Sequence, residues 1–120
     1  MRARRLALTL ALAVFAVACA SSAPRADAAK RPSGSGWYCR TIFESDLNEE
    51  AECVRTQAEC ERLVPYERAR DPRCRKDSSA VCFTDALGAH CYDGRWRCNY
   101  EARLARDGGR KDASECVGWD

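Results

Sequence analysis

Eight cysteines lie within the 84 residues from Trp37 to Asp120. The same stretch holds only nine large aliphatic and nine aromatic residues, a thin core for a domain of this length. Small domains gain only about 3–5 kcal/mol from an apolar core, and disulfides commonly supply the rest of their stability. We therefore expect a small disulfide-rich α+β domain over 37–120. Four disulfides would be formed by Cys39, Cys53, Cys60, Cys74, Cys82, Cys91, Cys98 and Cys116.

The first 18 residues have the composition of an export signal. Arg2, Arg4 and Arg5 precede a run of mostly apolar residues over 6–18. A helix of that run would span about 20 Å, less than the ~30 Å hydrocarbon core of a bilayer, so residues 1–18 are predicted to be a signal peptide. Without them the chain has 17 basic and 18 acidic residues, and this balance gives no reason to expect nucleic-acid binding.

The end of this segment, Phe15-Ala16-Val17-Ala18-Cys19 followed by Ala20-Ser21-Ser22, resembles the lipobox of bacterial lipoproteins. The resemblance implies that Cys19 carries a lipid and attaches the protein to a membrane. The alternative is ordinary cleavage after the small-x-small site at 26–28, which would release a freely secreted protein. If Cys19 carries a lipid, residues 19–36 are the anchor cysteine and a flexible tether, because 20–36 contain no large apolar residue. In layout the remainder resembles small Cys-rich bacterial lipoproteins of unknown function.

The cysteine spacing repeats once along the chain. It reads C-x13-C-x6-C-x13-C and then C-x8-C-x6-C-x17-C, which predicts two tandem ββα-like units over 37–76 and 80–120, with chance spacing as the alternative. In the first unit, strands are expected over 37–43 and 52–55. Thr56 and Glu59 have the form of a capping box for a helix that presents Cys60, Leu63 and Val64 on one face and ends at Pro65.

The second unit follows the same plan. Strands are expected over 81–84 and 90–92, and a helix capped by Asp93 runs toward Arg106. Within each unit we expect the first strand to be linked to the helix and the second strand to the last cysteine. The predicted bonds are Cys39–Cys60, Cys53–Cys74, Cys82–Cys98 and Cys91–Cys116.

The sequence offers little for catalysis. Its one histidine, His90, lies beside Cys91, which the disulfide framework needs in oxidised form. No two cysteines are as close as the C-x2–4-C of structural zinc sites, and the chain has no D-x-D-x-D-G calcium loop. We therefore expect neither an enzyme nor a bound metal or cofactor.

Binding remains as the expected role. Arg40 and Arg75 lie beside cysteines, as does the basic residue that a serine-protease inhibitor presents as bait. Trp96 and Trp119 are candidates for a binding face, with a place in the core as the alternative. The expected function is a noncatalytic interaction module of the bacterial cell envelope that is exported and anchored by a lipid on Cys19, with an unknown protein or glycan as partner. The alternative is a secreted protease inhibitor.

Overall fold

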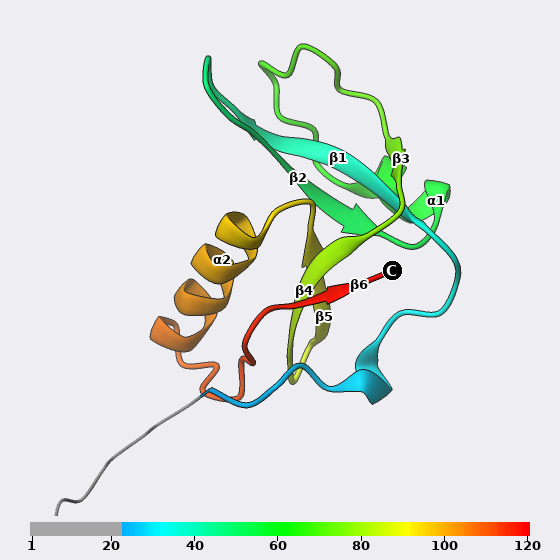
Figure 1. The fold of residues 1–120 in the computed structure, drawn as a ribbon. Helices are drawn as coiled ribbons and strands as arrows, with labels where there is room; N and C mark the ends of the chain where they lie inside the picture. Colours follow the sequence, from blue (N-terminus) through cyan, green and yellow to red (C-terminus); the bar gives the residue numbers. More distant parts are fainter. Residues whose placement is uncertain (1–22) are drawn as a thin grey trace, which may run out of the picture.

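A computed structural model describes residues 23–120; the predicted signal peptide and Cys19 lie outside the described residues. The described chain forms one curled antiparallel sheet with the strand order β3-β1-β2-β5-β4-β6 (Figure 1). The strands are β1 (Trp37–Glu44), β2 (Glu49–Val54), β3 (Arg75–Asp77), β4 (Ala80–Asp85), β5 (Gly88–Tyr92) and β6 (Val117–Trp119). The helices are the 3₁₀ turn η1 (Ala28–Lys30) and the α-helices α1 (Gln57–Arg62) and α2 (Arg95–Asp107). A small disulfide-rich α+β domain is therefore confirmed.

Four disulfides join the eight cysteines of the domain, as predicted, but the predicted partners were wrong. The bonds are Cys39–Cys53, Cys60–Cys74, Cys82–Cys91 and Cys98–Cys116. Two of them connect cysteines that lie directly opposite each other in neighbouring antiparallel strands, with Cα atoms 4.1 Å apart. Such positions bring side chains together on one face of a sheet, so each hairpin joins its own two cysteines. The other two bonds each tie a helix to the loop that follows it.

The two hairpin disulfides lie in one row of the sheet. Cys39, Cys53, Cys91 and Cys82 are successive partners across β1, β2, β5 and β4. Directly opposite residues share a face of the sheet, and on this face the cysteines pack with Trp37 and Trp119. The opposite face carries Phe83 and Tyr92, which pack against the buried side of α2. The disulfides thus form part of the core on one face of the sheet.

Residues 23–36 are part of the folded domain, contrary to the flexible tether that we expected. Ala26 packs against the core beside the disulfides, and the backbone N–H of Asp27 donates to Thr84 Oγ1 at 2.8 Å. The backbone N–H of Glu115 donates to the Pro24 carbonyl at 2.7 Å. In Figure 1 this segment runs below the turn end of β4 and β5 and through η1 before it enters β1. The segment is held mainly by hydrogen bonds. Its lack of large apolar residues therefore led to the wrong prediction of a flexible tether.

The helix ends differ in part from the expected ones. Thr56 and Glu59 form the predicted capping box, but α1 ends at Arg62, and Val64 is 83 % exposed instead of facing the core. At α2 the N-cap residue is Gly94. Asp93 instead accepts a hydrogen bond from the backbone N–H of Ala51 at 2.9 Å, so it links α2 to β2. Within residues 23–120, neither α-helix has the length and apolar character needed to cross a membrane.

Candidate functional site

The two arginines expected as protease bait are held within the fold. Arg40 donates hydrogen bonds from Nε to the Pro72 carbonyl at 2.8 Å and from Nη1 to the Leu63 carbonyl at 2.8 Å. Arg75 lies in β3, and its Nη2 is 2.8 Å from Glu49 Oε1. Both residues lie in paired strands of the sheet. Neither lies on an exposed loop, whereas an inhibitor must present its basic residue on such a loop to enter the active site of the protease.

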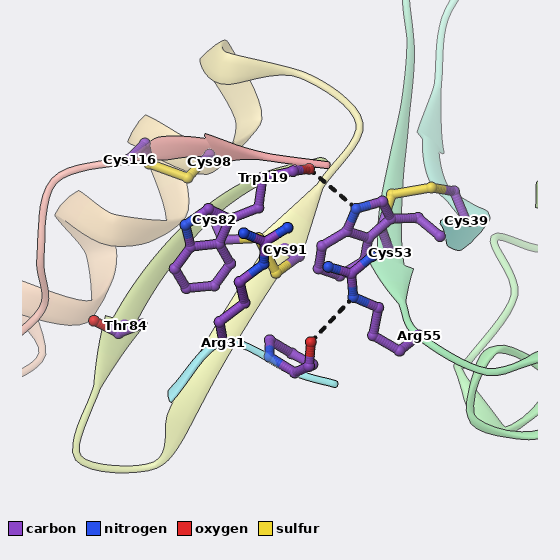
Figure 2. The surroundings of a disulfide bond; sticks show 12 residues. Arg31, Cys39, Cys53, Arg55, Cys82, Thr84, Cys91, Cys98, Cys116 and Trp119 are labelled. Carbon is purple, nitrogen blue, oxygen red and sulfur yellow. Dashed lines mark hydrogen bonds between the residues drawn. A yellow bond between two sulfur atoms is a disulfide. The ribbon is translucent and has the colours of Figure 1, made fainter. Parts of the chain in front are cut away.

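Trp119 belongs to the core and offers no binding face. Its carbonyl accepts a hydrogen bond from Nε1 of Trp37 at 3.1 Å, and both side chains are at least nine-tenths buried. Figure 2 shows Trp119 next to the row of disulfides, with Arg31 on its outer side and Arg55 nearby. The guanidinium carbon of Arg55 lies 3.7 Å from the centre of the Trp37 ring. For these two tryptophans the core interpretation is correct.

Trp96 is placed differently, because its side chain is 66 % exposed. It stacks on Tyr100 one turn further along α2, with ring centres 5.5 Å apart and an angle of 6° between the planes. The helix buries small residues at positions 98, 102 and 105, which lets it approach the sheet closely. Trp96 and Tyr100 follow a second line, four residues apart, on the flank of the same helix. The local sequence therefore places an aromatic pair, an exposed Trp96 on a half-buried Tyr100, beside a tightly packed helix face.

A shallow recess lies on one side of this aromatic pair. It has a volume of about 270 Å³ and is lined by Trp96, Asn99, Tyr100, Arg103 and Arg106. The guanidinium carbon of Arg103 is 5.8 Å from the centre of the Tyr100 ring. Arg103 is exposed and makes no ion pair with any residue of the described part of the chain. The recess thus combines aromatic rings with amide and guanidinium donors and has no carboxylate in its lining.

A second recess lies toward the β1–β2 hairpin. Its volume is about 330 Å³, and Phe43, Glu50, Trp96, Arg97 and Tyr100 line it. Trp96 and Tyr100 therefore form a wall shared by the two recesses. Phe43 is 40 % exposed and completes an apolar rim.

A buried ion-pair network forms the base of this second recess. Nη1 of Arg97 is 3.0 Å from Oε2 of Glu50, which is 5 % exposed, and Nη2 bonds to Glu101. Burial alone would lower the pKa of Arg97, but the hydrogen bond to Glu50 and the charge of Glu101 raise that pKa above its usual value. Nε of Arg97 is buried without a hydrogen-bond partner in the described structure. The network fixes the base of the aromatic wall and leaves Arg97 fully charged.

His90 and Cys91, the remaining candidates for catalysis, have structural contacts. Nε2 of His90 is 3.0 Å from Oδ1 of Asp85, and the imidazole stacks on Phe83 with ring centres 4.8 Å apart. The neighbouring Cys91 is in a disulfide, so it cannot serve as a nucleophile beside His90. Residues 23–120 contain no cluster of three or more His, Cys, Asp or Glu side chains that could hold a metal ion.

The residues around Trp96 were only partly predicted. Trp96 and Tyr100 were among the aromatic residues considered for a binding face, but Phe43, Asn99 and Arg103 were not singled out. The available signal was the four-residue spacing of Trp96 and Tyr100, which falls on a different helix line from Cys98 and Ala102. We call Phe43, Trp96, Asn99, Tyr100 and Arg103 the aromatic surface of α2.

Neither the protein-family models, nor the curated protein sequences, nor the solved structures contain a match to this chain.

Proposed function

We propose that this chain is an exported, lipid-anchored, noncatalytic module of the bacterial cell envelope that binds its partner through the aromatic surface of α2. The observation that carries the proposal is the placement of Trp96. Two of the three tryptophans are buried in the core, whereas Trp96 is 66 % exposed near Arg103, a cation that pairs with no acid among residues 23–120. Trp, Tyr and Arg are the residues that most often dominate binding energy at interfaces.

Export is supported by the disulfides. Four of them in a domain of this size are typical of an extracellular or exported protein, because reducing compartments keep thiols unpaired.

Anchoring at Cys19 is supported by the contacts of the N-terminal segment. Cleavage after Ala28 would remove Ala26, which packs on the core, and Asp27, which bonds to Thr84. Cleavage before Cys19 would keep both contacts. Four residues separate Cys19 from Pro24, a distance of at most about 18 Å in extended form, so the domain would lie close to the membrane surface.

We also propose that the two halves of the domain are copies of one ββα-like unit. Each half has two strands, a helix and a short strand, in the order β1-β2-α1-β3 and then β4-β5-α2-β6. Each half also has one strand–strand disulfide and one helix–loop disulfide. The sheet order β3-β1-β2-β5-β4-β6 is symmetric about the contact between β2 and β5. Only the second copy carries an exposed tryptophan on its helix, so binding would be a property of that copy.

The protease-inhibitor alternative finds less support. Arg40 and Arg75 are both held in the sheet, by backbone carbonyls and by Glu49 respectively. We therefore do not propose inhibition.

The proposal is tested in a bacterial host that produces the full-length protein. A photo-reactive phenylalanine derivative, which keeps an aromatic ring at the position, replaces Trp96 in one variant and, as a matched control, Leu87 in another, because Leu87 is 76 % exposed on the β4–β5 turn. We expect a discrete envelope adduct from position 96 only, and we expect Arg103→Gln to lower its yield. Equal adducts at both positions, or none at position 96, would contradict the proposal.

The anchor is tested separately by the intact mass of the same protein. An N-terminus at Cys19 that carries acyl mass is the expected result. An unmodified N-terminus near Ala29 would contradict lipid anchoring, although it would leave the binding surface to be judged by the adducts.

A further inference from the structure

We infer that the ligand of the aromatic surface of α2 is a carboxylate-bearing sugar unit of an envelope glycan. This inference rests on the function proposed above and specifies its partner. It follows from three properties of the recess beside Trp96: a flat exposed ring, donors without a competing acid, and a small volume.

The exposed ring suits a sugar. Trp96 is 66 % exposed and is held nearly parallel to Tyr100, with an angle of 6° between the planes, and both rings line the recess. A pyranose has an apolar C–H face of similar extent and hydroxyl groups around its edge. The C–H face can lie against these rings, and Asn99 and Arg106, which line the same recess, are hydrogen-bond donors for the hydroxyl groups. Nη1 of Arg106 is fixed by the carbonyls of Ala113 and Ser114, which orients the guanidinium before a ligand arrives.

The charge of the recess favours an anion. Its lining contains Arg103 and Arg106 and no carboxylate. Arg103 pairs with no acid among residues 23–120, in contrast to Arg70, Arg73 and Arg75, which each lie within 4 Å of a carboxylate. A guanidinium binds a carboxylate through two parallel hydrogen bonds, so Arg103 is suited to the acid group of a ligand stacked on Trp96.

The size of the site favours a sugar unit over a folded protein. A stable protein interface buries about 800 Å² on each partner and has an apolar centre. On the exposed side of α2 only Leu104, at 45 %, adds a large apolar residue, and its other exposed residues, Arg95, Asn99, Arg103 and Asp107, are polar or charged. The recess of about 270 Å³ is slightly smaller than the ~300–1,000 Å³ usual for small-molecule sites, which suits a single sugar unit.

The experiment uses the full-length lipoprotein in detergent micelles, with ¹⁵N in its tryptophan indoles. One probe is the disaccharide of N-acetylglucosamine and N-acetylmuramic acid, which carries a carboxylate. The matched probe is N,N′-diacetylchitobiose, which has the same type of acetylated sugar rings and no carboxylate. We expect the acidic disaccharide to shift the Trp96 signal, leave the signals of Trp37 and Trp119 in place, and bind at least tenfold more tightly than the neutral one.

Substitutions then separate the contributions of ring and charge. Trp96→Ala should abolish binding of both sugars, whereas Arg103→Gln should reduce the affinity for the acidic sugar to that for the neutral one. Arg62→Gln is the control, because Arg62 is an exposed arginine at the end of the other helix, α1. It should leave both affinities unchanged.

Two results would overturn the inference. One is the absence of any Trp96 shift with either sugar and with oligogalacturonate as a second acidic glycan. The other is a Trp96 shift caused by an acidic peptide such as hexaglutamate and by none of the sugars. In either case the adduct formed from position 96 in cells still tests the binding function itself, so the two proposals fail independently.

Discussion

Cys53 and Cys91 lie directly opposite each other across the contact between β2 and β5, yet each is bonded to a different cysteine. Cys53 is joined to Cys39 and Cys91 to Cys82, so each disulfide closes the hairpin of its own half of the chain. The four cysteines belong to one face of the sheet, where they pack in the same core cluster as Trp37 and Trp119. No disulfide connects the two halves, which are held together by the hydrogen bonds and packing of the sheet and by the N-terminal segment.

This connectivity predicts the products of tryptic digestion under denaturing, nonreducing conditions. Cleavage after Arg55 separates Cys53 from Cys60, so peptide 41–55 should be found linked to the peptide that contains Cys39. Peptide 56–62 should be found linked to the short peptide that contains Cys74. Mass spectrometry distinguishes these products from the linked peptides 56–62 and Cys39 that a strand-to-helix bond would give. Reduction before digestion is the control and should release every peptide singly.

Removal of Trp37 and removal of Trp96 should have very different effects on stability. Trp37 is 1 % exposed, packs on the disulfides and lies under the guanidinium of Arg55, so Trp37→Ala should lower the free energy of unfolding by about 3–5 kcal/mol. Trp96→Ala should cost about 1 kcal/mol or less, because that side chain is two-thirds exposed. Chemical denaturation of the oxidised proteins measures both. Equal losses would show that Trp96 is a core residue and not part of a binding surface.

The sequence was informative where a local rule determines the structure. The number of disulfides followed from cysteine parity, and the start of α1 followed from the capping box of Thr56 and Glu59. The disulfide partners did not follow, because they depend on strand register, and a hairpin with four residues between its strands can pair in more than one way.

The exposure of Trp96 and the order of residues 23–36 also depend on contacts between residues that are far apart in the sequence. Trp96 and Trp119 cannot be told apart from composition, and only the packing of α2 on the sheet leaves one exposed and the other buried. Residues 23–36 were expected to be a tether because they lack large apolar side chains. Arg55 donates hydrogen bonds to the carbonyls of Pro32 and Gly36 in this segment, and no local sequence pattern predicts that Arg55 is buried.

Substitution of Arg55 should release the N-terminal segment. Arg55 is 6 % exposed and donates hydrogen bonds to the carbonyls of Pro32, Gly36 and Asp120, at 3.2, 2.7 and 2.8 Å. It thereby ties the segment before β1 to the end of β6. Arg55→Gln should cost about 2–4 kcal/mol of unfolding free energy, because three carbonyls lose a charged donor in a buried place.

Hydrogen exchange distinguishes local release from a general loss of stability. In Arg55→Gln the amide of Asp27, which is bonded to Thr84, should exchange much faster, while amides in the centre of β2 stay protected. Arg62→Gln, which changes an exposed arginine, should leave both rates as they are. If the Asp27 amide kept its protection in Arg55→Gln, the segment would be held by other contacts.

Asp85 should make the stability of the domain depend on pH in the acidic range. Its side chain is fully buried, and Oδ1 accepts from the Leu87 N–H at 2.8 Å and contacts Nε2 of His90 at 3.0 Å. Oδ2 is 2.9 Å from Nη1 of Arg110. Burial alone would raise the pKa of Asp85, but the hydrogen bonds from His90 and Leu87 and the charge of Arg110 together bring that pKa below its usual value.

A carboxylate with a lowered pKa in the folded state stabilises the fold above its unfolded pKa, near 4, and this contribution is lost as the pH falls through the folded pKa. Asp85→Asn should therefore cost about 2–4 kcal/mol at pH 7, because it removes the charge from a buried network, and the difference from the unsubstituted protein should shrink below about pH 4. Urea unfolding between pH 7 and pH 2 measures the difference. Asp107→Asn, at an exposed position that forms no ion pair among the described residues, is the control and should cost little at any pH. A difference for Asp85→Asn that stayed constant down to pH 2 would mean that the network stabilises the β4–β5 turn by its shape and not by the charge of Asp85.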